Sequence, residues 1–306
     1  MTPRTASDRS ADQDTLGSLI QHVQRELTAA GIEAPDREAR WLIQHALGLT
    51  GSSQLLDRTR RVDGDSLVKV FACLNRRAAR EPLQYILGSQ EFCGLEFEVN
   101  PAVLIPRVET ELLVQHVIRR LPHGVHHLVV DVGTGSGCLA VTLGRAVPDA
   151  TIVATDVSLE ALETAKRNAR RHGGTDIRWL HGDLLAPLAG LGYEGSVAAI
   201  MANPPYIRES EWKDLQPEVG RYEPRLALVA GARGTEVHER ILDQAVVYLA
   251  PGGFLAMEMG RGQSDEIAER IRRLPAYELA EVVPDEAGID RIVIVRRAGS
   301  PRADYG

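Results

Sequence analysis

The sequence predicts a doubly wound α/β domain preceded by a small helical domain. From Glu109 onward, short apolar runs alternate with amphipathic stretches, a pattern typical of a parallel sheet with helices on both faces. Before Glu81 the apolar residues recur at helical spacing only, with no strand pattern between them, which predicts short helices. A chain of 306 residues is long enough for one large domain or two unequal ones.

Three helices are expected in the N-terminal part. The first carries apolar residues at helical spacing and should end at Gly31 as its C-cap. The second should open at Pro35 and carry Leu49, with "LTGSS" as its break, and the third should cover Ser66 to about Arg80. The apolar faces comprise Leu16, Leu19, Ile20, Val23 and Leu27; Trp41, Leu42 and Leu49; and Leu67, Val70, Phe71 and Leu74. We expect a disordered tail over residues 1–13 and a helical domain over 14–85.

A short hairpin should link this domain to the rest. "EFCGLEFEVN" alternates aromatic and apolar residues around Gly94, the pattern of a β-hairpin, and we assign the linker to residues 86–104. Residues 105–298 should form the α/β domain and 299–306 a tail. The expected strands of the α/β domain are "HLVVDVG", "TIVATDV", "IRWLHGD", "SVAAIMANPPY" and "GGFLAMEMG". Its expected helices include "GCLAVTLGRAV" and "LEALETAKRNARRHG". At the end of the domain, "YELAEVVP" with "RIVIVRR" should close the sheet as a hairpin.

Composition excludes several classes of protein. Apolar residues make up 44% and charged residues 25%, as in globular rather than disordered chains. The net charge of −7 argues against a protein that mainly grips a phosphate backbone, because such proteins carry a basic excess. The polar N-terminus is neither a signal peptide nor a membrane anchor, and no apolar run approaches the length that spans a bilayer.

Cysteine and histidine usage points to a reducing compartment and to no metal. Cys73, Cys93 and Cys138 are widely spaced and form no CxxC pair, so a disulfide framework is not expected and the cytoplasm is the natural location. The histidines of one loop, His123, His126 and His127, have no partnering cysteine or acidic ligand nearby in the sequence, and we expect no metal site there.

A glycine-rich loop follows the first strand of the α/β domain. In "VVDVGTGSGC", Gly133, Gly135 and Gly137 come directly after the strand that holds Asp131. Glycine lets backbone amides approach a ligand, and the following helix offers its positive N-terminal end. A merely tight strand-to-helix turn seldom needs three glycines in five residues. The dinucleotide fingerprint G-x-G-x-x-G is not met, because Cys138 follows the third glycine.

The ends of the next two strands complete a crevice of adenosine shape. Asp156 ends the second strand and can accept hydrogen bonds from both ribose hydroxyls, or alternatively cap the next helix, although Ser158 suits that role as well. Asp183, after the third strand, can accept from an exocyclic amine while Leu184 packs on a purine face. Ligands of such sheets bind at the carboxyl ends of the strands.

The fourth strand ends in "NPPY", residues 203 to 206. The Asn203 side-chain oxygen and the Pro204 carbonyl are two acceptors held by proline rigidity, which suits an NH₂ group with two donors. Pro205 adds stiffness and Tyr206 adds a flat surface for a planar amide or amine. A purely structural interpretation also exists, in which the prolines end the strand and Asn203 caps the turn.

This combination resembles the S-adenosylmethionine-dependent class I methyltransferases that carry a (D/N)PP(Y/F) signature, found in nucleobase amino-methyltransferases and in glutamine-amide methyltransferases. Over residues 15 to 297 the chain resembles the peptide chain release factor glutamine methyltransferases. The resemblance differs at Val108, where the family usually has proline, and in "VPDEAGID", which lacks a basic residue common there. The segments that carry it are "EPLQYILGSQEFCGLEFEVNPAVLIPRVETELLV", "DVGTGSG", "NPPYI", "EVGRYEPRLALVAG", "LAPGGFLAMEMG" and "GIDRIVIV".

The resemblance implies a class I, Rossmann-like methyltransferase domain, with S-adenosylmethionine as cofactor and the glutamine of the Gly-Gly-Gln motif in class 1 release factors as substrate. It implies that the helical domain recognises that protein partner and that the hairpin also contacts it. Glu258 could assist electrostatically or serve as an ordinary cap. The implied cofactor residues are Asp131, Gly133, Thr134, Gly135, Ser136, Gly137, Asp156, Asp183, Leu184 and Asn203; Asn203, Pro204 and Tyr206 are catalytic; and Asn203, Pro204, Pro205 and Tyr206 bind the substrate.

Two other interpretations remain at this stage. Amino-methylation of adenine or guanine in nucleic acid shares the NPPY chemistry, but it predicts a basic face and a base-flipping pocket, against which the net charge and the helical N-terminal domain argue. A non-catalytic binding module of the same fold would not need every acceptor to be present. We therefore expect no membrane association and no specific nucleic-acid binding.

Overall fold

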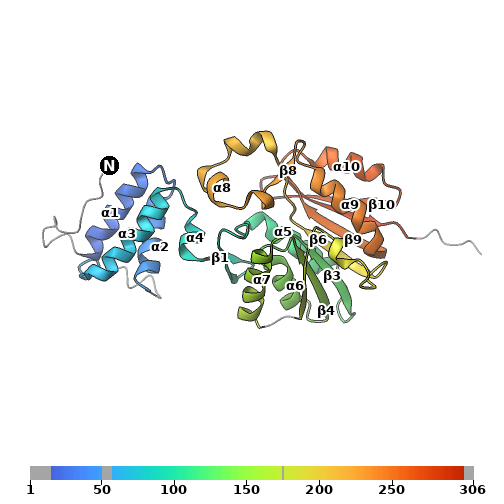
Figure 1. The fold of residues 1–306 in the computed structure, drawn as a ribbon, viewed down its shortest axis with the longest axis horizontal. Helices are drawn as coiled ribbons and strands as arrows, with labels where there is room; N and C mark the ends of the chain where they lie inside the picture. Colours follow the sequence, from blue (N-terminus) through green and yellow to red (C-terminus); the bar gives the residue numbers. More distant parts are fainter. Residues whose placement is uncertain (1–14, 50–56, 174–175, 300–306) are drawn as a thin grey trace, which may run out of the picture. The chain divides into compact units, whose positions relative to one another are not determined.

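The protein is described here from a computed structural model, which places residues 15–49, 57–173 and 176–299. The chain forms two compact units, one made of residues up to Gly88 together with Pro217–Tyr222, the other made of Ser89–Gln216 and the chain from Glu223 onward (Figure 1). The predicted tail 1–13, nearly all of the tail 299–306 and most of the "LTGSS" break lie outside the described residues.

The first unit is helical and has its own core. Helices α1, α2 and α3 pack around a cluster that includes Leu27, Leu42 and Val70, all fully buried (Figure 1). Gly31, with φ of 73°, ends α1 as predicted, and the Ile32 amide donates to the Leu27 carbonyl at 3.0 Å. The helices of this unit are α1 (Leu16–Ala29), α2 (Pro35–Ala46), α3 (Gly64–Ala78), α4 (Leu83–Leu87) and α8 (Pro217–Tyr222).

Two helix boundaries differ from the prediction. Helix α2 ends at Ala46, so Leu49 lies outside it, because Gly48 adopts φ of 62° and terminates the helix two residues earlier. Helix α3 begins at Gly64 because Asp63 is its N-cap, with the side chain accepting from the Ser66 amide.

Helix α8 comes from far along the chain and is held in the helical unit by charge. Arg77 is 6% exposed and pairs with Glu38 at 2.5 Å and with Glu218 of α8 at 2.9 Å. Arg80 also pairs with Glu218, at 2.7 Å, and the Tyr222 hydroxyl donates to the Ala79 carbonyl. A buried guanidinium needs such partners, because unpaired it would cost several kcal/mol.

The second unit is built on one large sheet. Within the described residues it has seven strands in the order β10-β11-β9-β6-β3-β4-β5. The five strands from β9 to β5 run parallel, while β11 is antiparallel to β9 and to β10. This confirms the predicted doubly wound α/β class and its closing hairpin. The strands are β3 (His127–Val132), β4 (Ala150–Asp156), β5 (Ile177–His181), β6 (Val197–Ala202), β9 (Leu249–Glu258), β10 (Tyr277–Pro284) and β11 (Asp290–Arg297).

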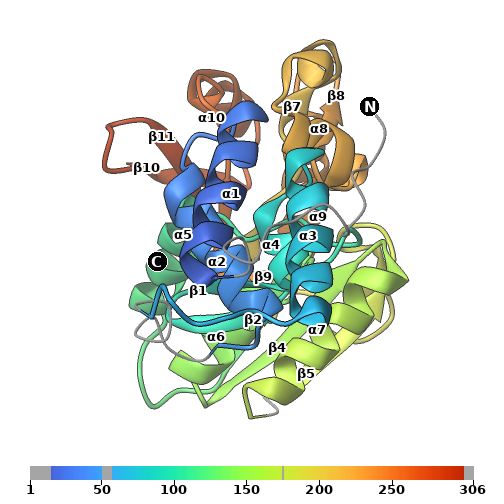
Figure 2. The ribbon, with the colours of Figure 1, turned by 90° about the vertical axis from the view of Figure 1, so that its left-hand side faces the viewer.

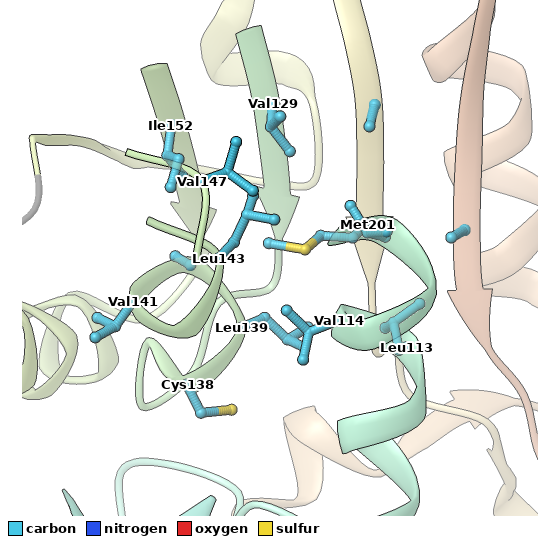
Figure 3. Packing of buried hydrophobic residues seen from close by; sticks show 14 of the residues in the cluster. Leu113, Val114, Val129, Cys138, Leu139, Val141, Leu143, Val147, Ile152 and Met201 are labelled. Atoms are coloured by element: carbon cyan, nitrogen blue, oxygen red, sulfur yellow. The ribbon is translucent and has the colours of Figure 1, made fainter. Parts of the chain in front are cut away.

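Helices cover both faces of this sheet. Alternate strand residues point to opposite sides, so Val129 and Met201 meet Leu139 and Val114 in one core, as Figure 3 shows. Their neighbours on the same strands enter the opposite core with α9 and α10. Figure 2 shows α7 beside β4 and β5. The helices are α5 (Val108–Arg120), α6 (Cys138–Ala146), α7 (Leu159–Arg171), α9 (Glu236–Tyr248) and α10 (Ser264–Arg272).

The predicted hairpin is present as β1 (Ser89–Phe92) and β2 (Leu95–Glu98), paired antiparallel. Its two-residue turn has φ of 50° at Cys93 and 74° at Gly94, as a tight hairpin turn requires. Phe92 and Phe97 are buried and meet edge to face, with ring centroids 6.1 Å apart.

The stretch between β6 and α9 was not predicted in any detail. Besides α8 it contains three-residue and longer 3₁₀ turns and a two-stranded parallel pairing of β7 (Ile207–Arg208) with β8 (Val229–Gly231). None of the helices that the structure describes combines the length and apolar character of a membrane span.

Candidate active site

A cavity of about 740 Å³ opens at the carboxyl ends of the parallel strands. This volume lies within the range of small-molecule and cofactor sites. Its lining includes residues 101–104 and 106, Thr110, the loop 132–136 with residues 138 and 139, residues 156–158, 160 and 161, Asp183 and Leu184, residues 203–205, residues 224, 226, 227, 229 and 230, and residues 237, 240 and 241.

The glycine loop is held open toward the cavity by its backbone. Gly133 and Gly135 have φ of 70° and 57°, a region that only glycine enters without strain. The amides of Gly133 and Thr134 both donate to the Thr155 carbonyl of β4 at 2.9 Å. A Cβ at Gly133 would meet nothing within 4 Å, so the space beside the loop belongs to the cavity.

Asp131 supports this loop from within the core. Its carboxyl is fully buried, and its Oδ2 accepts from the Thr134 hydroxyl at 2.6 Å. Burial raises the pKa of Asp131 to about 7. Among the described residues, Asp131 does not line the cavity. Its carboxyl therefore affects the loop through its hydrogen bond with Thr134.

Asp156 lies at the cavity and does not cap the following helix. Its Oδ2 accepts from the Gly135 amide at 2.9 Å and its Oδ1 from the Ser158 amide at 2.8 Å. The Ser158 hydroxyl is the N-cap of α7, accepting from the Ala161 amide. Burial raises the pKa of Asp156, and the backbone hydrogen bonds oppose this shift. Each carboxylate oxygen keeps a lone pair for a further donor.

The end of β5 contributes Asp183 and Leu184 to the lining. Leu184 has φ of 48°, a strained conformation for a residue with a side chain. The Asp183 carboxylate forms an ion pair with Arg240 of α9, and about half of each side chain is exposed. Arg240 also lines the cavity and was not identified from the sequence.

The NPPY segment lies on the same cavity. Asn203, Pro204 and Pro205 line it, and the Asn203 side-chain Nδ2 donates to the Thr110 hydroxyl oxygen at 3.0 Å. The Tyr206 backbone carbonyl accepts from the side-chain Nε2 of Gln263 at 2.9 Å. The Tyr206 ring is absent from the described cavity lining, and a Cβ placed on Gly260 would lie 3.0 Å from its Cδ2 atom.

A buried carboxyl stands behind Asn203. Glu258, at the end of β9, is 2% exposed, and its Oε2 accepts from the Thr110 hydroxyl at 2.6 Å. Burial raises the pKa of Glu258 to about 7. The sequence contained Thr110 within "IPRVETE", but only the fold brings it between Asn203 and Glu258.

Two walls of the cavity are tied together by Glu223, which is 5% exposed. Its Oε2 accepts from the Ile105 amide at 3.1 Å and its Oε1 from Arg107 at 2.5 Å. The neighbouring prolines, Pro106 and Pro224, both line the cavity. Glu223 was not among the predicted site residues.

The structure brings most of the predicted site residues to one place. Gly133, Thr134, Gly135, Ser136, Asp156, Asp183, Leu184, Asn203, Pro204 and Pro205 all line the cavity. Of the predicted site residues, Asp131 and Tyr206 lie outside the described cavity lining, and Gly137 is the third that does. Its place is at the start of α6, where a Cβ would come within 3.0 Å of the Ala165 Cβ on α7.

Each of the two units contains a segment that matches a known family model. Residues 18–88 match the family model described as "PrmC N-terminal domain", and residues 108–217 match "Methyltransferase small domain". Among solved structures, the hMettl16 catalytic domain in complex with MAT2A 3'UTR hairpin 6 is similar with a TM-score of 0.51 and 17% identity, over 78% of this chain and 82% of that one. At that identity the likeness concerns the fold alone.

Curated relatives are similar over nearly the whole chain. A release factor glutamine methyltransferase of Geobacter sulfurreducens is 39% identical over 91% of this chain and 95% of its own. Another of Moorella thermoacetica is 40% identical over 92% of this chain and 99% of its own. Each of these matches covers more than nine-tenths of this chain, so each includes residues of both units. The chain belongs to the release factor glutamine methyltransferase family.

Proposed function

We propose that this enzyme transfers a methyl group from S-adenosylmethionine to the side-chain amide nitrogen of the glutamine in the Gly-Gly-Gln motif of class 1 release factors. The observation that carries the proposal is the position of Asn203. Its amide lines the same cavity as the glycine loop and Asp156, and its Nδ2 is engaged by Thr110. The Asn203 Oδ1 is therefore the amide atom available to an incoming NH₂ group.

The residues around the loop fit S-adenosylmethionine. When bound, the cofactor supplies an electrophilic methyl group on a sulfonium. Gly133 and Gly135 leave space for its methionine part, with Thr134 and Ser136 beside them. Asp156 would accept from the ribose hydroxyls with the lone pairs that its backbone partners leave free. Leu184 and Asp183 would border the adenine, and Asp131 would contribute by fixing Thr134.

Asn203 and Pro204 would position the acceptor amide. A carboxamide nitrogen is a poor nucleophile because its lone pair is delocalised into the carbonyl. Hydrogen bonds from its two N–H groups to the Asn203 Oδ1 and the Pro204 carbonyl oxygen would orient it toward the methyl group. Tyr206 would complete the NPPY turn, and Pro205 would keep it rigid. Holding the two reactants in line is capable of lowering a barrier by up to about 7–11 kcal/mol.

The helical unit is proposed to recognise the protein partner. We keep the predicted boundaries, with residues 14–85 for recognition, 86–104 as the linker and 105–298 for methyl transfer. The substrate is a translation factor, so we place the reaction in the cytoplasm. Specific nucleic-acid binding is not part of the proposal, because the net charge of −7 opposes contact with a phosphate backbone.

The test is methyl transfer from labelled S-adenosylmethionine to purified class 1 release factors. We expect label on the glutamine of Gly-Gly-Gln by mass spectrometry, and none on a factor whose glutamine is replaced by asparagine. DNA duplexes and RNA hairpins form parallel arms of the assay. Label on adenine or guanine, with an unmodified release factor, would replace this proposal with the nucleobase alternative.

A further inference from the structure

A hydrogen-bonded chain of three side chains ends at the proposed acceptor site. Glu258 accepts from the Thr110 hydroxyl at 2.6 Å, and the oxygen of that hydroxyl accepts from the Asn203 Nδ2 at 3.0 Å. Glu258 and Thr110 are each 2% exposed. These hydrogen bonds join the end of β9, the first turn of α5 and the end of β6. Glu258 has no role in the chemistry proposed above, where Thr110 enters only as the hydrogen-bond partner of the Asn203 Nδ2.

The direction of this chain is set by the acid at its buried end. An ionised carboxylate can only accept hydrogen bonds, and a threonine hydroxyl has a single proton to donate. If that proton goes to Glu258, the Thr110 oxygen can only accept from its other neighbour. The Asn203 amide must then present Nδ2 to Thr110 and leave Oδ1 for the cavity.

We infer that Glu258 is a positioning residue, which acts through Thr110 to keep the Asn203 carbonyl oxygen directed at the substrate. The consequence for catalysis rests on the proposed function, since an amide substrate needs an acceptor at this point. If the acid were uncharged and able to donate, the hydroxyl could donate to Asn203 instead. The Asn203 NH₂ would then face the substrate NH₂, and two donors would meet.

The charges near Glu258 come from several elements. Glu109 of α5 opposes its ionisation, and Arg291 of β11 and Arg107 before α5 favour it. Tyr206 lies close enough for Glu258 to raise the pKa of its hydroxyl. The backbone carbonyl oxygen of Glu258 lies 2.8 Å from the ring Nε2 of buried His238. With its pKa raised to about 7, Glu258 loses its charge as the pH falls below neutrality.

Four variants test whether catalysis depends on the donor–acceptor direction of these hydrogen bonds or only on the packing of the side chains. Glu258→Gln keeps the shape but allows the terminal group to donate, and Thr110→Val keeps the shape but removes the hydroxyl. Thr110→Ser keeps the hydroxyl, and Thr142→Val is a control at a buried threonine on α6 whose hydroxyl has no partner among the residues that the structure describes. We expect Glu258→Gln and Thr110→Val to lower kcat by about tenfold or more, since a charge-assisted hydrogen bond is lost, with S-adenosylmethionine affinity unchanged. Thr110→Ser and Thr142→Val should stay near wild type.

The double variant tests whether the two residues act through one route. Because both effects pass through Asn203, Thr110→Val combined with Glu258→Gln should have the kcat of Thr110→Val alone. Multiplied losses would overturn the inference, as would a parallel fall in cofactor affinity or in the unfolding midpoint that accounts for the loss of kcat.

A second measurement needs no substrate. The chain has four asparagines, at positions 75, 100, 168 and 203, so selective ¹⁵N-asparagine labelling yields four side-chain NH₂ pairs, and Asn203→Asp identifies one. In the full-length enzyme the Asn203 pair should titrate with an apparent pKa near that of Glu258, about 7, and should also do so in Thr110→Ser. The titration should disappear in Glu258→Gln and weaken strongly in Thr110→Val.

The two arms distinguish failure of the inference from failure of the proposed function. If wild-type enzyme does not methylate release factors but the Asn203 signals follow Glu258, the function is wrong and the chain of hydrogen bonds stands. If methylation is efficient while Asn203 ignores the Glu258 and Thr110 substitutions in both arms, the inference is wrong and the function stands.

Discussion

Asp156 illustrates how a single residue is freed for a ligand. Ser158 caps α7, so the carboxylate of Asp156 is not consumed by the helix and instead organises the loop through the Gly135 amide. Two backbone donors keep both of its oxygens in fixed positions beside the cavity. An acid that was ambiguous in the sequence becomes a cofactor candidate because a neighbour takes the alternative role.

We expect Asp156→Ala to weaken S-adenosylmethionine binding by roughly 1.5–3 kcal/mol for each charge-assisted hydrogen bond lost. Isothermal titration calorimetry measures this directly. Asp156→Asn is the matched control, since it keeps an oxygen and should lose less. Unchanged affinity in Asp156→Ala would mean that the ribose binds elsewhere.

Asn203→Ala should separate binding from transfer. The cofactor contacts proposed at the glycine loop and at Asp156 remain, so S-adenosylmethionine affinity should change little. Methyl transfer should fall by about 10²–10³, as when one aligned polar group of an active site is removed. Steady-state kinetics with a release factor checks this, and near-normal turnover would remove Asn203 from the mechanism.

The cavity-lining residues that the sequence predicted follow strands, whereas those that it did not predict come from other elements. Gly133, Asp156 and Asn203 each stand just past a strand, and parallel strands bring their ends together. Thr110 lies on α5 and Arg240 on α9, so no local pattern connects them to the crevice. Glu223 owes its role to a contact 118 residues away along the chain.

At the scale of elements, the approach of α6 to α7 depends on one glycine. Gly137 has φ of 81°, and a Cβ there would lie 3.0 Å from the Ala165 Cβ and 3.2 Å from its Cα. The neighbouring atoms belong to a helix and cannot move independently. The sequence predicted that all three glycines of the loop approach a ligand, and the geometry at Gly137 indicates a role in helix packing as well.

We therefore expect Gly137→Ala to lower the free energy of unfolding by more than the roughly 1–2 kcal/mol that left-handed backbone costs a residue with a side chain. Gly94→Ala is the matched control, because its φ of 74° is similar but its added Cβ would meet nothing within 4 Å. Urea denaturation of both variants measures the difference. Equal losses of unfolding free energy in the two variants would show that the added Cβ at Gly137 meets no steric hindrance from Ala165 of α7.

The elements themselves were predictable where a single period dominates. Alternating strands and amphipathic helices of the sheet followed from apolar spacing, as did α1 with its Gly31 cap. The region from residue 207 to 231 resisted prediction because its short strands, 3₁₀ turns and α8 are held by distant partners. Arg77 and Arg80 fix α8 through Glu218, and such pairings have no local signature.

At the scale of the whole molecule, two buried acids link stability to pH. Burial raises the pKa of both Asp131 and Glu258 to about 7. Between their unfolded pKa values, near 4, and 7, the native state binds more protons than the unfolded state. Stability should therefore fall as the pH rises through this window.

We expect the free energy of unfolding to be greater at pH 5.5 than at pH 8, and this difference to shrink in Asp131→Asn and in Glu258→Gln. Denaturant titrations at several pH values provide the measurement. The proposed positioning role of Glu258 needs its charge, so activity should change in the opposite direction over the same range. A pH-independent unfolding free energy would show that the two acids ionise as freely as in the unfolded chain.

The last prediction concerns how a tripeptide target is recognised. Gly-Gly-Gln offers little side-chain surface, whereas a stable protein–protein interface buries about 800 Å² on each partner. Affinity must then come from a wider surface, and the helical unit exposes Trp41 and Val68, which are 41% and 67% exposed.

Trp41→Ser and Val68→Ser should lower kcat/KM for an intact release factor and leave kcat/KM for a short Gly-Gly-Gln peptide unchanged. Val247→Ser, at a 50% exposed valine of α9, is the matched control and should affect neither substrate. The wild-type enzyme should also prefer the intact factor strongly over the peptide. Equal kcat/KM values for the two substrates would contradict a recognition role for the helical unit, because a short peptide lacks the protein surface that this unit would contact.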